Sequence, residues 1–173
     1  MPRRVYSKRT IVVRPKKRWA SIMKSTSYGT NLTSGQSNQV NSHDLVVNST
    51  DSATPTPIVV KTGNFKLYGT TNTSIASTDI YKLYNVTAYV MYCPQGYTYT
   101  TLLDITNHPE YIMGRSTFRF VPGENCSCSL SSRLKRNLNS GDKVCLVLHA
   151  AKDSALTGTL NIYLNWQYYT CAN

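Results

Sequence analysis

Apolar and polar residues alternate in short segments along much of this chain. The clearest case lies near the end, where every second residue is apolar: Leu160, Ile162, Leu164, Trp166 and Tyr168. Shorter segments of the same kind contain Val86, Ala88 and Val90, and then Val144, Leu146 and Leu148, with turn residues such as Pro94, Pro122-Gly123 and Gly141 between the segments. A period of two places one face in a core and the other in water, as in antiparallel sheets. The pattern therefore predicts an all-β sandwich or barrel.

One segment departs from this alternation. Leu130, Leu134 and Leu138 are spaced by four residues, and Gly141 follows them. This spacing fits one face of a helix, so we predict a short helix or turn over Ser129–Asn137. Its outer face would carry a second basic cluster, made of Arg133, Lys135 and Arg136. The cluster is either a solvated helical face or a contact with nucleic acid or a neighbouring subunit.

Positive charge is concentrated at the start of the chain. The 173 residues include 19 Lys and Arg against 8 Asp and Glu, which gives a formal net charge of +11. Residues 1–24 hold nine of these cations and no acid, because the first acidic residue is Asp44. The other residues are almost neutral. Since like charges repel and bury little apolar surface, we predict that residues 1–24 form a disordered basic arm.

We interpret this arm as a nucleic-acid-binding segment without base specificity. Lys and Arg pair with phosphates and release counterions, while tyrosine and tryptophan rings can stack on unpaired bases. If all nine cations met single-stranded phosphates, log K would fall with log[salt] at a slope of roughly −6. The predicted contacts in the arm are Arg3, Arg4, Tyr6, Lys8, Arg9, Arg14, Lys16, Lys17, Arg18, Trp19 and Lys24.

Other functions of a basic tail remain open. A solubilising segment is one, and a targeting address is another, because organelle presequences are also rich in Arg and poor in acids. Arg14, Lys16, Lys17 and Arg18 form a short cluster that fits a nuclear localisation signal.

The sequence offers no recognisable catalytic or metal-binding motif. The pair Cys126 and Cys128 is too closely spaced for a zinc knuckle and lacks a second pair or a nearby histidine. A glycine-rich phosphate loop is missing, and no apolar run approaches the roughly 20 residues of a membrane span. We expect no enzymatic activity, no metal, no cofactor and no membrane insertion. We also expect Cys145 to be a small buried thiol, whereas Tyr97 and Tyr99 belong either to a solvated loop or to an interface.

Three features resemble capsid proteins of small circular Rep-encoding single-stranded DNA viruses, the circovirus-like group. The segment Leu134-Lys135-Arg136-Asn137-Leu138-Asn139-Ser140-Gly141-Asp142 resembles their LKRNL-x-SGD segment. The start Met1-Pro2-Arg3-Arg4 is also similar, as is a tyrosine-rich strand that ends at a proline, here Ile80–Pro94.

The resemblance implies a single eight-stranded antiparallel jelly-roll sandwich that assembles into an icosahedral T=1 shell of sixty copies. It further implies a circular single-stranded DNA genome bound by the basic arm, a place in the virion, and passage through the host nucleus during assembly. It does not identify a host-cell receptor. A coat protein of a small RNA or satellite virus and a cellular nucleic-acid-binding β protein are the alternatives.

Composition divides the chain into three regions. Residues 1–24 form the arm, and residues 25–57 form a polar hinge that leads into the first strand. Residues 58–173 are expected to form the shell domain. Its first strand is expected to begin earlier, within the hinge region, at about residue 43.

Overall fold

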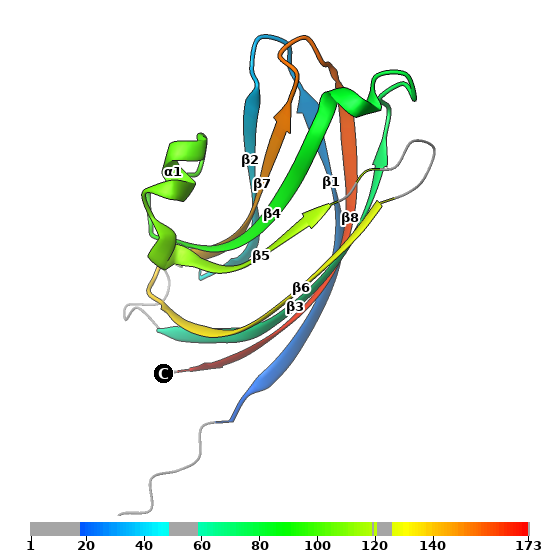
Figure 1. Cartoon of the computed structure of the whole chain (residues 1–173). Helices are drawn as coiled ribbons and strands as arrows, with labels where there is room; N and C mark the ends of the chain where they lie inside the picture. Colours follow the sequence, from blue (N-terminus) through cyan, green and yellow to red (C-terminus); the bar gives the residue numbers. More distant parts are fainter. Residues whose placement is uncertain (1–17, 49–58, 119, 121–125, 173) are drawn as a thin grey trace, which may run out of the picture.

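The computed structural model describes residues 18–48, 59–118, 120 and 126–172. These residues form eight strands in two four-stranded sheets, with one short α-helix and two 3₁₀ helices in their connections. Figure 1 shows the two sheets packed face to face as a sandwich.

The first sheet has the strand order β1-β8-β3-β6, and all its neighbours are antiparallel. Its strands are β1 (Ala20–Leu32), β8 (Gly158–Ala172), β3 (Val60–Thr73) and β6 (Cys126–Leu138).

The second sheet has the strand order β2-β7-β4-β5 and is antiparallel throughout. Its strands are β2 (Asn38–Val47), β7 (Lys143–Lys152), β4 (Leu83–Cys93) and β5 (Ile112–Phe118). Apart from the step from β4 to β5, each connection passes from one sheet to the other. This strand order is that of a jelly roll, so the all-β fold predicted for the chain is confirmed.

Alternating side chains build the core between the sheets, as the sequence predicts. Ile162 and Leu164 of β8 are almost fully buried, and so are Val86 of β4 and Leu146 of β7. The rings of Phe65 and Tyr168 stack within this core with centroids 5.4 Å apart. The faces expected for these strands are therefore confirmed.

The predicted helix over Ser129–Asn137 is wrong, because these residues belong to strand β6. A spacing of four residues fits a helical face, but four is also an even number, so it fits an alternating strand equally well. Cys126, Cys128 and Leu130 face the core, while the serines between them are exposed. β6 pairs with β3 along its length, and an irregularity opposite Gly63–Phe65 interrupts the alternation.

The expected beginning of the first strand near residue 43 is also wrong. Strand β1 begins at Ala20, and Asp44 lies near the end of β2. Lys24, assigned to the arm from the sequence, is therefore a strand residue. Polar residues fill β1 because one of its faces is exposed and it pairs only with β8. Residues 1–17 lie outside the described part of the chain.

A second, smaller apolar cluster covers the outer face of the second sheet. The connection between β4 and β5 contains α1 (Leu102–Thr106) and η2 (Pro109–Tyr111), which lie against this sheet (Figure 1). Tyr99 and Ile105 from this connection pack on Cys145 and other buried residues of β4 and β7. We call residues 94–111 the cover segment. Burial of the Cys145 thiol confirms the prediction made for it.

Lys152 holds the loops together at the end of the sandwich where β1 leads into β2. Its side chain is completely buried, and four backbone carbonyl oxygens lie within hydrogen-bond distance of its ammonium nitrogen, which shares its three N–H donors among them. The acceptors and distances are Thr33 at 2.8 Å, Gln36 at 2.7 Å, Asp153 at 3.3 Å and Leu156 at 3.0 Å. A buried charge needs such full satisfaction, so this lysine is part of the fold and does not meet a solution partner. Among the described residues, no helix is long and apolar enough to cross a membrane.

Candidate nucleic-acid interface

The first sheet contains cations without acids. None of its four described strands includes an Asp or Glu, and together they carry Lys24, Lys61, Lys66, Arg133, Lys135 and Arg136. The acids among the described residues lie in the second sheet or in the connections between strands: Asp44, Asp79, Asp104, Glu110, Asp142 and Asp153. The sandwich therefore has one uncompensated positive sheet, which attracts polyanions.

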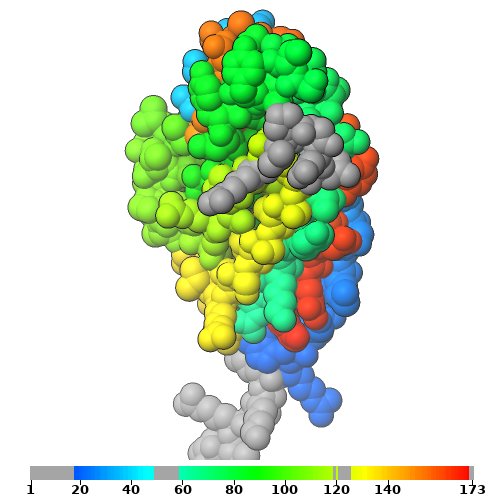
Figure 2. Space-filling model, turned by 45° about the vertical axis from the view of Figure 1, so that its right-hand side comes forward, coloured from blue at the N-terminus to red at the C-terminus, as the bar shows by residue number. Residues whose placement is uncertain are grey.

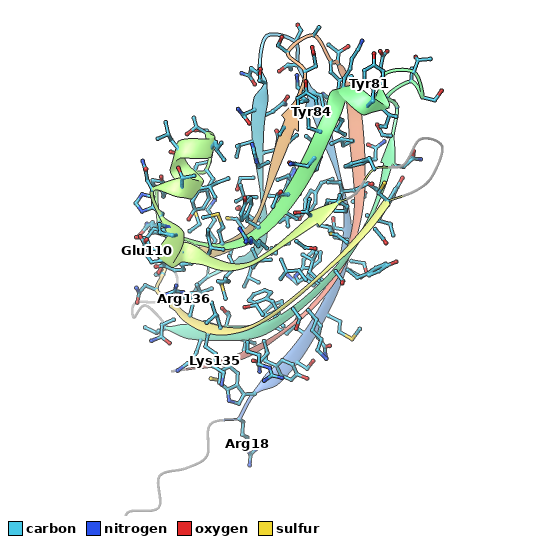
Figure 3. The ribbon with its side chains drawn as sticks, in the orientation of Figure 1. Arg18, Tyr81, Tyr84, Glu110, Lys135 and Arg136 are labelled. Atoms are coloured by element: carbon cyan, nitrogen blue, oxygen red, sulfur yellow. The ribbon has the colours of Figure 1, made fainter. Side chains whose placement is uncertain are left out.

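The end of this sheet at which β1 begins carries several of these cations. Ala20 pairs with Thr170 of β8, and Val60 of β3 pairs with Ala172, so the start of β1 and the end of β8 lie together. Arg18 and Lys135 are found at this end in Figure 3. Residues 1–17, the greater part of the predicted arm, are joined to the fold at this point.

Lys135 crosses strand β3 to reach Trp19. Its ammonium nitrogen lies 5.2 Å from the centroid of the Trp19 ring, which is a cation–π contact. Gly63, the partner of Lys135 across the sheet, leaves room for this path, because a Cβ added there would lie 2.5 Å from Lys135 Cγ. Two predicted site residues are thus brought together, and both remain exposed.

Arg136 points elsewhere. Its guanidinium group donates a hydrogen bond to the backbone oxygen of Glu110 and lies 6.0 Å from the centroid of the Tyr92 ring. Figure 3 shows Arg136 beside Glu110, away from Arg18. These contacts tie β6 to the cover segment. Arg133, Lys135 and Arg136 therefore do not share one face, as the predicted helix required.

Lys61 and Lys66 are candidate contacts that the sequence prediction missed. Both lie on β3, in the middle of the sheet, and are separated by tens of residues from the arm and from β6. Because they lie far from the other cations along the chain, no cluster of cations in the sequence points to them. The lack of acids in all four segments that form the first sheet is the sequence feature that could have indicated a basic surface.

The cysteines that show resolved pKa shifts behave in two ways. Burial raises the pKa of Cys128 to about 12, so its thiol stays protonated at neutral pH. The pKa of Cys145 is also raised, first by its hydrogen bond with Cys93 and then by burial, and its thiol donates to Asp44 Oδ1 at 3.3 Å. The pKa of Cys93 is lowered by the same bond with Cys145. The described residues include no cluster of three or more His, Cys, Asp or Glu side chains arranged to hold a metal ion.

The chain has few detectable similarities to known proteins. No family model matches the chain, and no curated protein matches it. A solved chain from Desmodium yellow mottle tymovirus aligns with 11% sequence identity over 96% of both chains, at a TM-score of 0.30. The strand order, and not this likeness, assigns the jelly roll.

Proposed function

We propose that this chain is a viral coat protein that assembles into a closed shell and packages single-stranded nucleic acid. The observation that carries the proposal is a jelly roll whose first sheet has no acid in its strands and begins at Ala20, within the segment of residues 1–24 that holds nine clustered cations. Jelly rolls serve capsids, lectins and cupins. A strongly basic segment attached to an acid-free sheet favours the capsid among these.

The finer proposal is a T=1 shell of sixty copies around a circular single-stranded DNA genome. It rests on the resemblance of residues 134–142 to the circovirus-like segment. In the fold these residues are the end of β6 and the turn into β7, where Asp142 accepts hydrogen bonds from the backbone N–H groups of Asn139 and Gln95. The segment thus shapes a turn of the fold, and its presence does not by itself choose DNA over RNA.

Assembly would use many weak contacts at once. Every copy in a closed shell contacts several neighbours, so contacts that are weak singly become stable together. Closed symmetry also limits growth to a defined size. Exposed residues in the described connections between strands would offer the required surfaces.

The test begins with the full chain, expressed and purified without denaturation. We expect electron microscopy and sedimentation to show uniform particles that contain nuclease-protected nucleic acid. Digestion of the extracted nucleic acid by DNase or by RNase then decides between the two genome types. A protein that stays small and carries no nucleic acid would contradict the proposal, and one that stays small but retains nucleic acid would favour a cellular β protein.

A charge variant tests the basic segment. Replacing Arg3, Arg4, Lys8, Arg9, Arg14, Lys16 and Lys17 with Gln removes seven cations. The slope of log K against log[salt] for a thymidine oligonucleotide should become less steep by about 5, since each single-stranded phosphate contact contributes about 0.7. Lys82→Gln is the matched control, because Lys82 is already paired with Asp79 at 2.7 Å, and its slope should equal that of the unaltered protein.

A further inference from the structure

A groove crosses the outer face of the first sheet. Two adjoining hollows of about 590 Å³ and 450 Å³ form it, and they share Lys66 and Ser131. The larger hollow lies between Met23, Tyr68 and Gln167, and the smaller one extends to Arg133 and Tyr169. Figure 2 looks onto this side, where β6, β3, β8 and β1 run side by side from yellow through teal and red to blue.

Exposed aromatic rings stand on this face. Tyr68 of β3 and Tyr163 of β8 expose 51% and 52% of their surface, although the residues next to them in each strand are buried. Small side chains on β6, at Ser127, Ser129 and Ser131, keep the space beside the rings open. Flat rings with free faces above a shallow floor suit the stacking of unpaired bases.

Hydrogen-bonding and charged groups surround these rings. Asn165 pairs with Tyr68 across the sheet, and Gln167 pairs with Lys66. Both amides already touch β1, through Ser25 at 2.5 Å and Ser21 at 2.8 Å, so they are held in place. Lys66 and Arg133 line the groove, and the four strands contain no acid that could neutralise them.

The same face continues to the beginning of β1. Gly63 pairs with Tyr169, which must face outward because its neighbour Tyr168 is buried in the core. Lys135 lies over Gly63 on this outer side and reaches Trp19. A strand of nucleic acid held by residues 1–18 would therefore meet Trp19 and Lys135 first and the groove next.

We infer that the outer face of sheet β1-β8-β3-β6 binds single-stranded nucleic acid, with bases stacked on Tyr68 and Tyr163 and phosphates paired with Lys66 and Arg133. The inference rests on the proposed function and deepens it, because it makes this sheet the genome-facing side of the subunit. Two copies joined through this face would bring like charges together, which disfavours self-association here. A polyanion is the occupant that the charge selects.

Photocrosslinking of the full chain tests the inference directly. The probe is a thymidine oligonucleotide with 5-iododeoxyuridine at alternate positions, followed by mass spectrometry of the crosslinked peptides. We expect crosslinks at Tyr68 and Tyr163. Tyr81 and Tyr84 are the matched controls, because they are more exposed, at 71% and 66%, and lie outside the four strands of this sheet, at the end of the molecule opposite Arg18 (Figure 3). Crosslinks confined to residues 1–24, or equally frequent at Tyr81 and Tyr84, would overturn the inference.

A pair of double variants measures the contribution of stacking. Tyr68→Ala with Tyr163→Ala should weaken oligonucleotide binding by about thirtyfold or more, since two stacked bases at about 1 kcal/mol or more each sum to about 2 kcal/mol or more. Tyr81→Ala with Tyr84→Ala should leave binding unchanged. Both pairs are exposed, so each variant should fold, and circular dichroism checks this. Measurements at raised salt reduce the contribution of the arm, which is more sensitive to salt than stacking is.

Particle formation separates failure of the inference from failure of the proposed function. If the Tyr68/Tyr163 variant no longer assembles while its subunits bind the oligonucleotide normally, the face is a contact between copies and the inference is overturned, but the coat-protein proposal stands. If the unaltered protein neither assembles nor binds nucleic acid, the proposed function itself fails.

Discussion

The outer faces of the two sheets differ in exposure: one is covered by another part of the chain, and the other is open to solvent. On sheet β2-β7-β4-β5, Met91, Cys145 and Val147 point away from the main core but are at most 1% exposed, because the cover segment lies over them. On sheet β1-β8-β3-β6, Met23 and Tyr68 remain 78% and 51% exposed. The chain thus buries one outer face by itself and leaves the other, with its cations, open to a partner. A single fold therefore has one covered side and one open side.

The first prediction concerns the cohesion of the covered side and has the largest expected effect. Tyr99→Ala should lower the free energy of unfolding by about 3–5 kcal/mol, the usual range for a buried aromatic residue. The Tyr99 ring is 1% exposed and packs edge-to-face on Tyr97 with centroids 5.2 Å apart. Its hydroxyl also donates to the backbone oxygen of Tyr92. Urea unfolding followed by circular dichroism measures the change.

The control for this variant is Tyr81→Ala. Tyr81 is 71% exposed, so its loss should change the free energy of unfolding by no more than about 0.5 kcal/mol. Equal effects of the two substitutions would mean that the cover segment is not a cohesive part of the fold.

Tyr99 also illustrates a limit of prediction from sequence. The alternation in the main strands predicts their faces correctly, because each strand needs only its own pattern to show which side is packed. Residues 97–101 are rich in Tyr and Thr, which predicts either a solvated loop or an interface for Tyr97 and Tyr99. The burial of Tyr99 and the partial burial of Tyr97 depend on a second apolar face, on β4 and β7, that the chain folds back to cover. The pattern within a short segment does not show that the segment will fold back over a distant strand.

The candidate site could be predicted only in part for a similar reason. A run of cations is visible in residues 1–24, and its attachment to the fold follows from chain order alone. Lys66 and Arg133, however, belong to separate segments that meet only through the pairing of β3 with β6. The leucine spacing in β6 predicts a helix, and a helix cannot pair with β3. The alternation of Cys126, Cys128 and Leu130 with serines in the same segment is typical of a strand.

The second prediction concerns the open side. Gly63→Ala should lower the free energy of unfolding by about 1–3 kcal/mol, the usual effect of overpacking. The added Cβ would lie 2.5 Å from Lys135 Cγ and 2.9 Å from the backbone oxygen of Leu134. Lys135→Ala removes the first of these clashes but not the second. In the Lys135→Ala background, the effect of Gly63→Ala should therefore be smaller.

A double-mutant cycle of these two substitutions, measured by urea unfolding, checks the expectation. Strict additivity would contradict the path of Lys135 over Gly63 and, with it, the continuity between Trp19 and the groove.

The third prediction concerns a single charge in the cover segment and has the smallest expected effect. Asp104 caps helix α1: its carboxylate accepts hydrogen bonds from the backbone N–H groups of Thr100 at 2.9 Å and Thr101 at 2.8 Å. These bonds lower the pKa of Asp104 to about 2. Because the pKa is lower in the folded protein, the charged form stabilises the fold above the ordinary pKa of 3.8, and this stabilisation is lost as the pH falls through about 2.

Asp104→Asn should therefore lower the free energy of unfolding by no more than about 1 kcal/mol at neutral pH, since the cap is partly exposed and screened by solvent. The difference from the unaltered protein should shrink as the pH falls from 4 towards 2. Thr101→Ala is the control, because it removes the hydroxyl that accepts from the Asp104 N–H and contains no titrating group, so its effect should change less with pH. The loss of unfolding free energy caused by Asp104→Asn could instead stay constant from neutral pH down to about 2. The cover segment would then be held by packing alone, and the Asp104 charge would not stabilise the covered side.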